Sequence, residues 1–371
     1  MQASDLPGLV AQVLWASFAL ALVFGAIAQR THFCTMGAVA DIVNMGDWTR
    51  MRMWLLAIGV AMIGFNAMVA LGWIEARHSV YAGPKLLWLS YAVGGLLFGF
   101  GMVLASGCGS KTLVRIGGGS LKSLLVFCVL AIASYATLKG IVAVARVATV
   151  DQVALVLPTG QDLPSLASHW WGGASRSWAL GIGAGIGLAL LVFVFMRREG
   201  RQADVLLGGL GIGAVVVGVW WLSGRWGHLA EHPLTLEESF LATNSQRMES
   251  LSFVAPMAYT MDWLILFSDK SKVLTIGIVS TLGVVLGSAA VALFSRSFRW
   301  EGFASTEDTA NHLVGATLMG VGGVTAMGCT VGQGMSGLST LALGSFVAFA
   351  AIVMGAVLGI RWQVWRLERS L

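Results

Sequence analysis

The sequence predicts an all-α membrane protein with about nine transmembrane helices, in which broken or re-entrant helices form an inverted repeat. Three observations predict this class: the composition, a series of long apolar segments, and a glycine-rich motif that occurs twice and ends in cysteine each time. Of the 371 residues, 57% are hydrophobic and only 11% are charged, and 48 are glycine. This composition lies outside the range of soluble globular proteins.

The apolar segments give the number of spans. A hydrocarbon core of about 30 Å requires about 20 apolar residues per helix. Segments of this kind lie at 8–29, 53–73, 86–106, 121–146, 177–197, 203–222, 273–294, 311–328 and 341–361. The first segment lacks a basic leader and a small-residue cleavage site, so we expect it to be a retained span. We expect one integral membrane domain, made of a first transmembrane repeat (1–146), two spans with outer-surface helical insertions (147–272) and a second transmembrane repeat (273–371).

The basic residues predict the orientation. An odd number of spans places the termini on opposite sides, and lysine and arginine concentrate in the loops that would be cytoplasmic if the N-terminus is outside. The turn "RREGR" at 197–201 contributes most to this bias. The net charge of +5 comes mainly from residues that flank the spans. We therefore expect contact with lipid and none with nucleic acid.

Two segments of the predicted outer side, 147–176 and 223–272, are more polar than the spans and contain most of the prolines. Their mixture of charged and apolar positions indicates short helices on the outer surface. We assign no chemistry to them. His169, His228 and His232 have no paired spacing, so they are interpreted as exposed polar residues, and no metal site or cofactor is predicted.

The internal repeat is the most informative feature. The segment "VGGLLFGFGMVLASGC" (93–108) matches "VGATLMGVGGVTAMGC" (314–329) at nine of sixteen positions without a gap, and both copies end in cysteine. On the predicted span order, the two copies end at opposite faces of the membrane. This is an inverted-topology repeat, from which many transporters build one central site.

The glycines within the repeat have helical spacing, which favours close helix packing. Around Cys108 and Cys329, however, "GCG" and "GCTVGQG" interrupt the helix. Irregular backbone at membrane depth is tolerated only where it is buried in protein or lines a wet cavity. Free backbone N–H groups at such breaks favour an anion. The predicted site therefore includes the neighbours of these cysteines: Gly107, Gly109, Ser110, Gly328, Thr330, Gly332 and Gln333.

A third cysteine follows the first span in "QRTHFCTMGAVAD" (29–41), and a weak echo of this segment occurs in "SRSFRWEGFAS" (295–305). In the echo, Phe298 matches Phe33 and Arg299 takes the position of Cys34. Cys128 lies within an apolar helix and is interpreted as packing. The four cysteines have no C-x-x-C spacing, so neither a zinc ribbon nor a disulfide framework is indicated.

The motifs "QRTHFC", "SGCGSKT" and "MGCTVGQGMSG" on a glycine-rich chain with about nine spans resemble the YeeE/YedE family of bacterial sulfur-compound transporters. The resemblance covers nearly the whole chain apart from the outer segments. It implies an hourglass-shaped monomer in the bacterial inner membrane, with Cys34, Cys108 and Cys329 along the substrate path. It also implies uptake of thiosulfate and a small cytoplasmic sulfur-carrier (sulfurtransferase) protein as partner.

The chemistry of these residues agrees with a sulfur-containing anion. Thiosulfate has a soft terminal sulfur, to which a neutral thiol can offer a weak S–H donor. Several weak sites in series allow passage, whereas one tight site traps the ion. Arg30, Lys111 and Arg299 are candidates for drawing the anion inward, and each is equally interpretable as a positive-inside anchor.

Two other classes of function remain open at this point. Cys34, Cys108 and Cys329, with Met36 and Met327, could bind Cu(I), although the basic residues would oppose a cation. A membrane sulfurtransferase would need a base for its nucleophile, for which His32 is the one candidate. The chain has no G-x-x-x-x-G-K-[ST] motif, so ATP drive is not expected. We therefore expect a transporter and not an enzyme.

Overall fold

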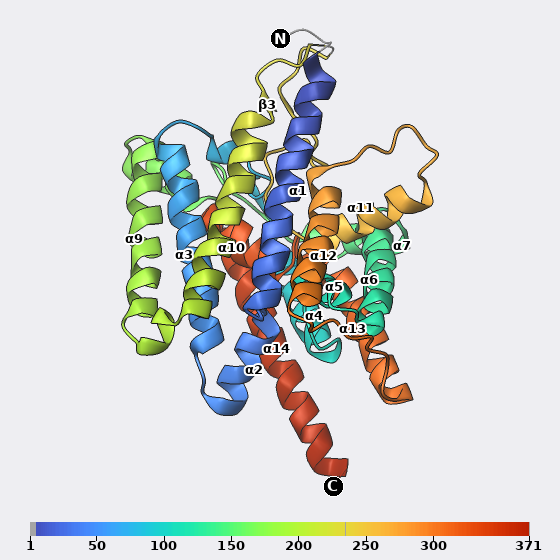
Figure 1. Cartoon of the computed structure of the whole chain (residues 1–371). Helices are drawn as coiled ribbons and strands as arrows, with labels where there is room; N and C mark the ends of the chain where they lie inside the picture. Colours follow the sequence, from blue (N-terminus) through green and yellow to red (C-terminus); the bar gives the residue numbers. More distant parts are fainter. Residues whose placement is uncertain (1–4, 234, 371) are drawn as a thin grey trace.

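The computed structural model describes residues 5–233 and 235–370, which form a helical bundle with a few two-residue strands (Figure 1). The elements up to the middle of the chain are α1 (Leu6–Arg30), α2 (Thr35–Met45), α3 (Thr49–Ala70), η2 (Ala76–His78), β1 (Lys85–Leu86), α4 (Trp88–Leu104), α5 (Gly109–Gly117), α6 (Leu121–Lys139), α7 (Ile141–Ala148), η3 (Val150–Gln152), β2 (Leu155–Val156) and α8 (Leu163–Trp171). They are followed by α9 (Ser175–Phe195), η4 (Arg198–Arg201), α10 (Ala203–Trp221), η5 (Leu222–Trp226), β3 (His228–Leu229), β4 (Ser239–Phe240), α11 (Val254–Ile265), α12 (Ile276–Phe294), α13 (Thr306–Thr325), η6 (Gly332–Gly337) and α14 (Leu343–Ser370).

The helical membrane class is confirmed, with one difference in the number of spans. In the described part of the chain, eight helical segments are long and apolar enough to cross a membrane, against about nine expected. The expected span at 311–328 lies mostly within α13, which is not among the eight. Its first turns contain Glu307, Asp308 and His312, and these polar residues lower its mean hydropathy.

A second difference concerns the fourth span. The sequence predicts one helix over 121–146, but α6 ends at Lys139 and α7 starts at Ile141. Gly140 lies between them in an extended conformation, with φ −101° and ψ −158°. The apolar run therefore continues across a break that hydropathy does not detect.

The helices divide into two groups in Figure 1. Helices α3, α9 and α10 pack together at one side, and α6, α7 and α13 lie at the other. Between them α1 packs on α12, and α4 packs on α13 and α14. The two termini of the described chain lie at opposite ends of the bundle.

Glycines bring α4 and α13 into backbone contact. A Cβ on Gly101 would lie 2.7 Å from the carbonyl oxygen of Gly315, and a Cβ on Gly322 would lie 2.6 Å from that of Gly94. The two helices are therefore antiparallel. The contacts are also reciprocal under the sequence repeat, because Gly94 corresponds to Gly315 and Gly101 to Gly322. Such reciprocity is what a two-fold axis requires.

The next pair of helices repeats this relationship. In α4, Gly99 lies against the backbone of Ile352 in α14, whereas its counterpart Gly320 in α13 lies against Leu130 in α6. Helix α4 thus packs on α14, the long helix that follows the break at Cys329. Helix α13 packs on α6, the long helix that follows the break at Cys108. Two short antiparallel sheets, β1–β2 and β3–β4, lie outside this arrangement in the inter-span segments.

Candidate functional site

Three breaks place a cysteine at the start of a short helix. Cys34 is the N-cap of α2 and Cys108 is the N-cap of α5, while Cys329 precedes the short helix that contains η6. The thiols of Cys34 and Cys329 each accept a hydrogen bond from a backbone N–H three residues on, at 3.4 Å from Gly37 N and Gly332 N. Sequence reasoning places these breaks correctly, because glycine surrounds each cysteine or follows it closely.

The turn before each cysteine has the same form. His32, Ser106 and Met327 have φ of 52°, 55° and 55°, a left-handed conformation uncommon for residues other than glycine. The next residue in each case donates its N–H to the carbonyl five positions back, for example Gly107 to Met102 at 2.8 Å. This is the Schellman pattern, in which a helix ends and the chain changes direction.

The segment 295–305, which weakly matches 29–41 in sequence, contains a fourth turn of this form. Arg296 has φ 56°, and Ser297 donates to the carbonyl of Ala292 at 2.8 Å. Matching the turns aligns Phe298 with Cys34, so the sequence alignment, which places Arg299 there, is shifted by one residue.

The breaks bring the cysteines together. The thiols of Cys34 and Cys108 lie within hydrogen-bonding distance of each other, and the Cys108 Sγ is 3.3 Å from Ser110 Oγ. Cys329 lies close enough to Cys108 for electrostatic interaction. All three cysteines are buried. The fourth, Cys128, is half-buried in α6 among apolar neighbours, as expected for a packing residue.

Two of these cysteines are followed by a threonine whose buried hydroxyl has no hydrogen-bond partner. Thr35 Oγ1 follows Cys34, and Thr330 Oγ1 follows Cys329 and lies near Cys108 without good hydrogen-bond geometry. A buried unpaired hydroxyl costs roughly 1–3 kcal/mol. The free Thr330 hydroxyl near Cys108, together with the three thiols, makes this cluster suitable for holding a polar ligand.

The Gln333 side chain stabilises the helix break at Cys329 through hydrogen bonds and does not face open space. Its Nε2 donates to the carbonyl of Ala326 at 2.6 Å, and its Oε1 accepts from Ser345 Oγ at 2.6 Å. The side chain therefore satisfies a free carbonyl at the end of α13. Among the predicted glycines, a Cβ added to Gly107 would come close to the Lys111 side chain, and one added to Gly332 would come close to Ser252. A Cβ added to Gly109 would have more room.

Two adjoining cavities of about 460 and 350 Å³ lead toward Cys34, and both are lined by His32, Lys111 and Arg115. The smaller one also contains Cys34 and Arg50. Arg299 lines the larger one. We call them the basic cavities. The predicted Arg30 lines neither, because it is exposed at the end of α1, 3.7 Å from Asp204.

A third cavity, of about 300 Å³, approaches from the opposite end of the bundle and reaches Gly328, next to Cys329. We call it the Tyr81 cavity. Burial raises the pKa of Glu249 in its wall to about 7. Much of its wall comes from the segment 223–272, to which the sequence assigned no chemistry. This segment contributes Asn244, Ser252 and Tyr259 to the wall, and Arg146 comes from α7.

Arg50, Tyr81 and Glu249 line the cavities, although the sequence does not predict them as site residues. Arg50 lies in the first turn of α3 and resembles a flanking anchor, but it lies over Gly37 and pairs with Asp41 at 3.2 Å. Tyr81 and Glu249 lie outside the repeated motifs. No local pattern marks these residues, because the contacts between distant segments place them.

The chain is similar to known proteins over most of its length. The family model described as "Sulphur transport" matches residues 30–358. A protein named "Thiosulfate transporter TsuA" from Escherichia coli (strain K12) is 24% identical over 351 residues, which is 92% of this chain and 92% of the relative. One of the same name from Spirochaeta thermophila is 23% identical over 92% of this chain and 97% of the relative. "Probable transporter YedE" of Escherichia coli is 33% identical over 98 residues, or 26% of this chain and 23% of the relative.

Proposed function

This chain belongs to the sulphur transport family, and from that membership we propose that it takes up thiosulfate, or a related small sulfur-containing anion, across a bacterial inner membrane. The observation that carries the proposal is the convergence of Cys34, Cys108 and Cys329 between cavities that approach from opposite ends. Relatives named thiosulfate transporters that match 92% of the chain support the choice of anion.

The anion enters through the Tyr81 cavity and meets Cys329 first. It then passes to Cys108, whose thiol lies beside Thr330 and Ser110, and on to Cys34. Each thiol offers a soft, weak donor, so the soft sulfur is held at each step without being trapped. The step needs no covalent bond, and we assign no catalytic residue.

The basic cavities receive the anion on the far side. Lys111 and Arg115 line both cavities, and Arg50 and Arg299 line one each. Positive charge at the exit lowers the energy of a departing dianion and fits the cytoplasmic side of the positive-inside rule. The N-terminus is then outside and the C-terminus cytoplasmic.

An inverted repeat underlies this arrangement in our proposal. The antiparallel, reciprocal contacts of α4 and α13 support it, as do the matched contacts of Gly99 and Gly320. A two-fold axis in the membrane plane relates the breaks at Cys108 and Cys329. The same proposal includes a small cytoplasmic sulfur-carrier protein that docks beside the basic cavities and consumes the imported sulfur.

Uptake into vesicles that contain only the pure protein tests the function. Labelled thiosulfate, sulfite, sulfate and their selenium analogues are compared with empty vesicles. We expect saturable uptake of thiosulfate and little uptake of sulfate. Absence of thiosulfate uptake, together with stoichiometric Cu(I) binding lost in Cys108→Ala, would replace the proposal with a soft-metal conduit.

A further inference from the structure

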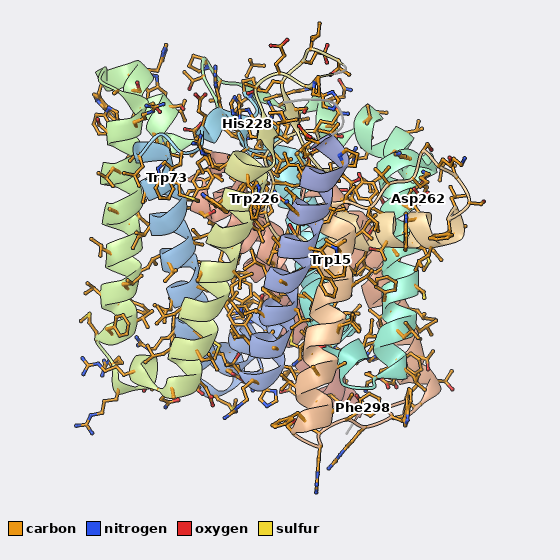
Figure 2. The ribbon with its side chains drawn as sticks, turned by 45° about the horizontal axis from the view of Figure 1, so that its top comes forward. Trp15, Trp73, Trp226, His228, Asp262 and Phe298 are labelled. Carbon is orange, nitrogen blue, oxygen red and sulfur yellow. The ribbon has the colours of Figure 1, made fainter. Side chains whose placement is uncertain are left out.

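A cluster of two histidines and a glutamate lies outside the cysteine cluster, close in sequence to residues that line the Tyr81 cavity. His78 ends η2, His228 begins β3 and Glu238 precedes β4. Figure 2 shows His228 at one end of the bundle and Phe298 at the opposite end. The sequence predicts that His228 is an exposed polar residue, but its side chain is half-buried. The cluster has no sequence signature because His78 comes from a distant segment.

The three side chains point at one another. His228 Nε2 lies 2.8 Å from Glu238 Oε1, and His78 Nε2 lies 3.4 Å from the same oxygen. One ligand atom from each residue lies within 4.8 Å of the other two. Ligand atoms around a tetrahedral Zn²⁺ lie about 3.3 Å apart, given metal–ligand distances of about 2.0–2.2 Å. Small side-chain movements would therefore produce that spacing.

The surroundings of the cluster hold it in place. The Phe240 ring stacks on His228 at 4.9 Å and contacts His78 at 5.4 Å between ring centres. His228 pairs with Phe240 in the β3–β4 hairpin, which fixes the histidine beside Glu238. Backbone hydrogen bonds between His78 and Met248 and between Val80 and Met248, both 3.0 Å, tie η2 to the same segment.

A fourth possible ligand atom is close by. Glu75 Oε2 lies 3.8 Å from His78 Nε2 and forms an ion pair with Arg77 at 2.6 Å. Two imidazoles and one or two carboxylates form a ligand set typical of zinc and similar divalent ions.

We propose that His78, His228 and Glu238 bind one divalent transition-metal ion of the zinc type, with Glu75 or water as fourth ligand. The ion fastens the β3–β4 hairpin to η2. Tyr81 follows His78 by three residues, and Glu249 adjoins Met248, so the ion joins two walls of the Tyr81 cavity. The site is distinct from the cysteine cluster and does not depend on the transported anion.

Metal titration of the purified, chelator-treated full chain tests the site. We expect one equivalent of Zn²⁺ to bind saturably and raise the apparent melting temperature. Co²⁺ should give visible absorption typical of four-coordinate nitrogen and oxygen ligation, without the near-ultraviolet bands of cysteine thiolate. That spectrum separates this site from the three buried cysteines.

Substitutions identify the ligands. His78→Ala and His228→Ala should each weaken Zn²⁺ binding about tenfold or more, because a three-ligand site loses one donor. His169→Ala, which removes an exposed histidine on α8, is the matched control and should bind as the native chain does. If the alanine variants do not fold, Glu238→Gln decides, since it keeps the size of the side chain. Native affinity in Glu238→Gln or His228→Ala, or no binding to the native chain, would overturn the proposal.

Discussion

The thiols of Cys34 and Cys108 face each other within hydrogen-bonding distance, although one caps α2 and the other caps α5. Neither helix alone forms this contact. It depends on two breaks that redirect the chain after α1 and after α4. The pair lies between the basic cavities and Cys329, where any ion that crosses the bundle along the proposed route must pass.

The first prediction concerns the thiols. Cys108→Ala and Cys329→Ala should each lower thiosulfate uptake about tenfold or more, because loss of one polar contact costs roughly 1–3 kcal/mol. Cys34→Ala should lower it as well, and serine should rescue poorly because it is a harder, more hydrated donor. Cys128→Ala is the control and should transport normally. Normal uptake by the Cys108→Ala, Cys329→Ala double variant would exclude a route through the cysteines.

The second prediction concerns selectivity. Thiosulfate and sulfate carry the same charge, and the backbone N–H groups at the breaks serve both ions about equally. Discrimination must then come from the thiols, and a few weak contacts supply roughly 1–3 kcal/mol, or about ten- to a hundredfold. Competition assays should show inhibition of labelled uptake by thiosulfate and hardly any by sulfate. Equal inhibition by both ions would contradict this prediction.

The third prediction concerns pH. The pKa of Glu249 is raised to about 7, chiefly by burial, so its carboxyl is neutral below pH 7 and negative above it. Uptake should fall as pH rises through 7. A charge about 8 Å away costs roughly 0.5–1 kcal/mol per anion charge at an effective dielectric of about 40–80.

Glu249→Gln should flatten this pH profile and keep the rate seen at low pH. Ser245, which donates to Glu249 at 2.9 Å, and the nearby Arg146, Tyr81 and Tyr259 remain in place in this variant. A profile that still falls through pH 7 in Glu249→Gln would assign the titration to another group.

The fourth prediction concerns orientation. Single cysteines at the exposed positions Arg198 and Gln246 lie in segments predicted for opposite sides. In intact cells, an impermeant thiol reagent should label Gln246→Cys at once and Arg198→Cys only after lysis. Labelling of both positions from outside would contradict the proposed topology.

The fifth prediction concerns the glycine contacts of α4 and α13. Gly101→Ala and Gly322→Ala should each lower stability by roughly 1–3 kcal/mol, because the added methyl meets backbone atoms of the opposite helix. Gly185→Ala in α9 is the matched control, since nothing lies within 4 Å of its added methyl. Apparent melting temperatures in detergent measure the effect. Equal values for all three variants would show that the helices do not pack this closely.

The sequence predicts the helices well, because membrane thickness imposes a strong length signal. The bounds of α9, α10 and α12 differ from the predicted spans by a few residues. It also places the breaks at Cys108 and Cys329, where glycine clusters interrupt an apolar run. The register near Arg299 is wrong by one, because left-handed residues at these turns are not glycine and give no local signal.

Contacts between distant segments could not be predicted in this way. The proximity of Cys34 to Cys108 depends on how α1 and α4 pack, and hydropathy contains no such information. Gln333 illustrates another limit, because a polar residue beside a cysteine suggests a contact with the ligand. Its amide instead forms hydrogen bonds with Ala326 and Ser345. The Tyr81 cavity was missed because much of its wall comes from the polar segment 223–272, which has no repeat.

The separation of the Tyr81 cavity from the basic cavities has an electrical consequence. Where water fills cavities on both sides, the membrane voltage falls mainly across the short cysteine layer between them. Moving one charge through 100 mV corresponds to about 2.3 kcal/mol. When the cell interior is negative at that voltage, the electrostatic energy of an entering dianion therefore rises by about 4.6 kcal/mol within this layer. On the proposed route, inward flux against that field requires the internal concentration of the anion to stay low. Its rate should therefore increase when the membrane is depolarised.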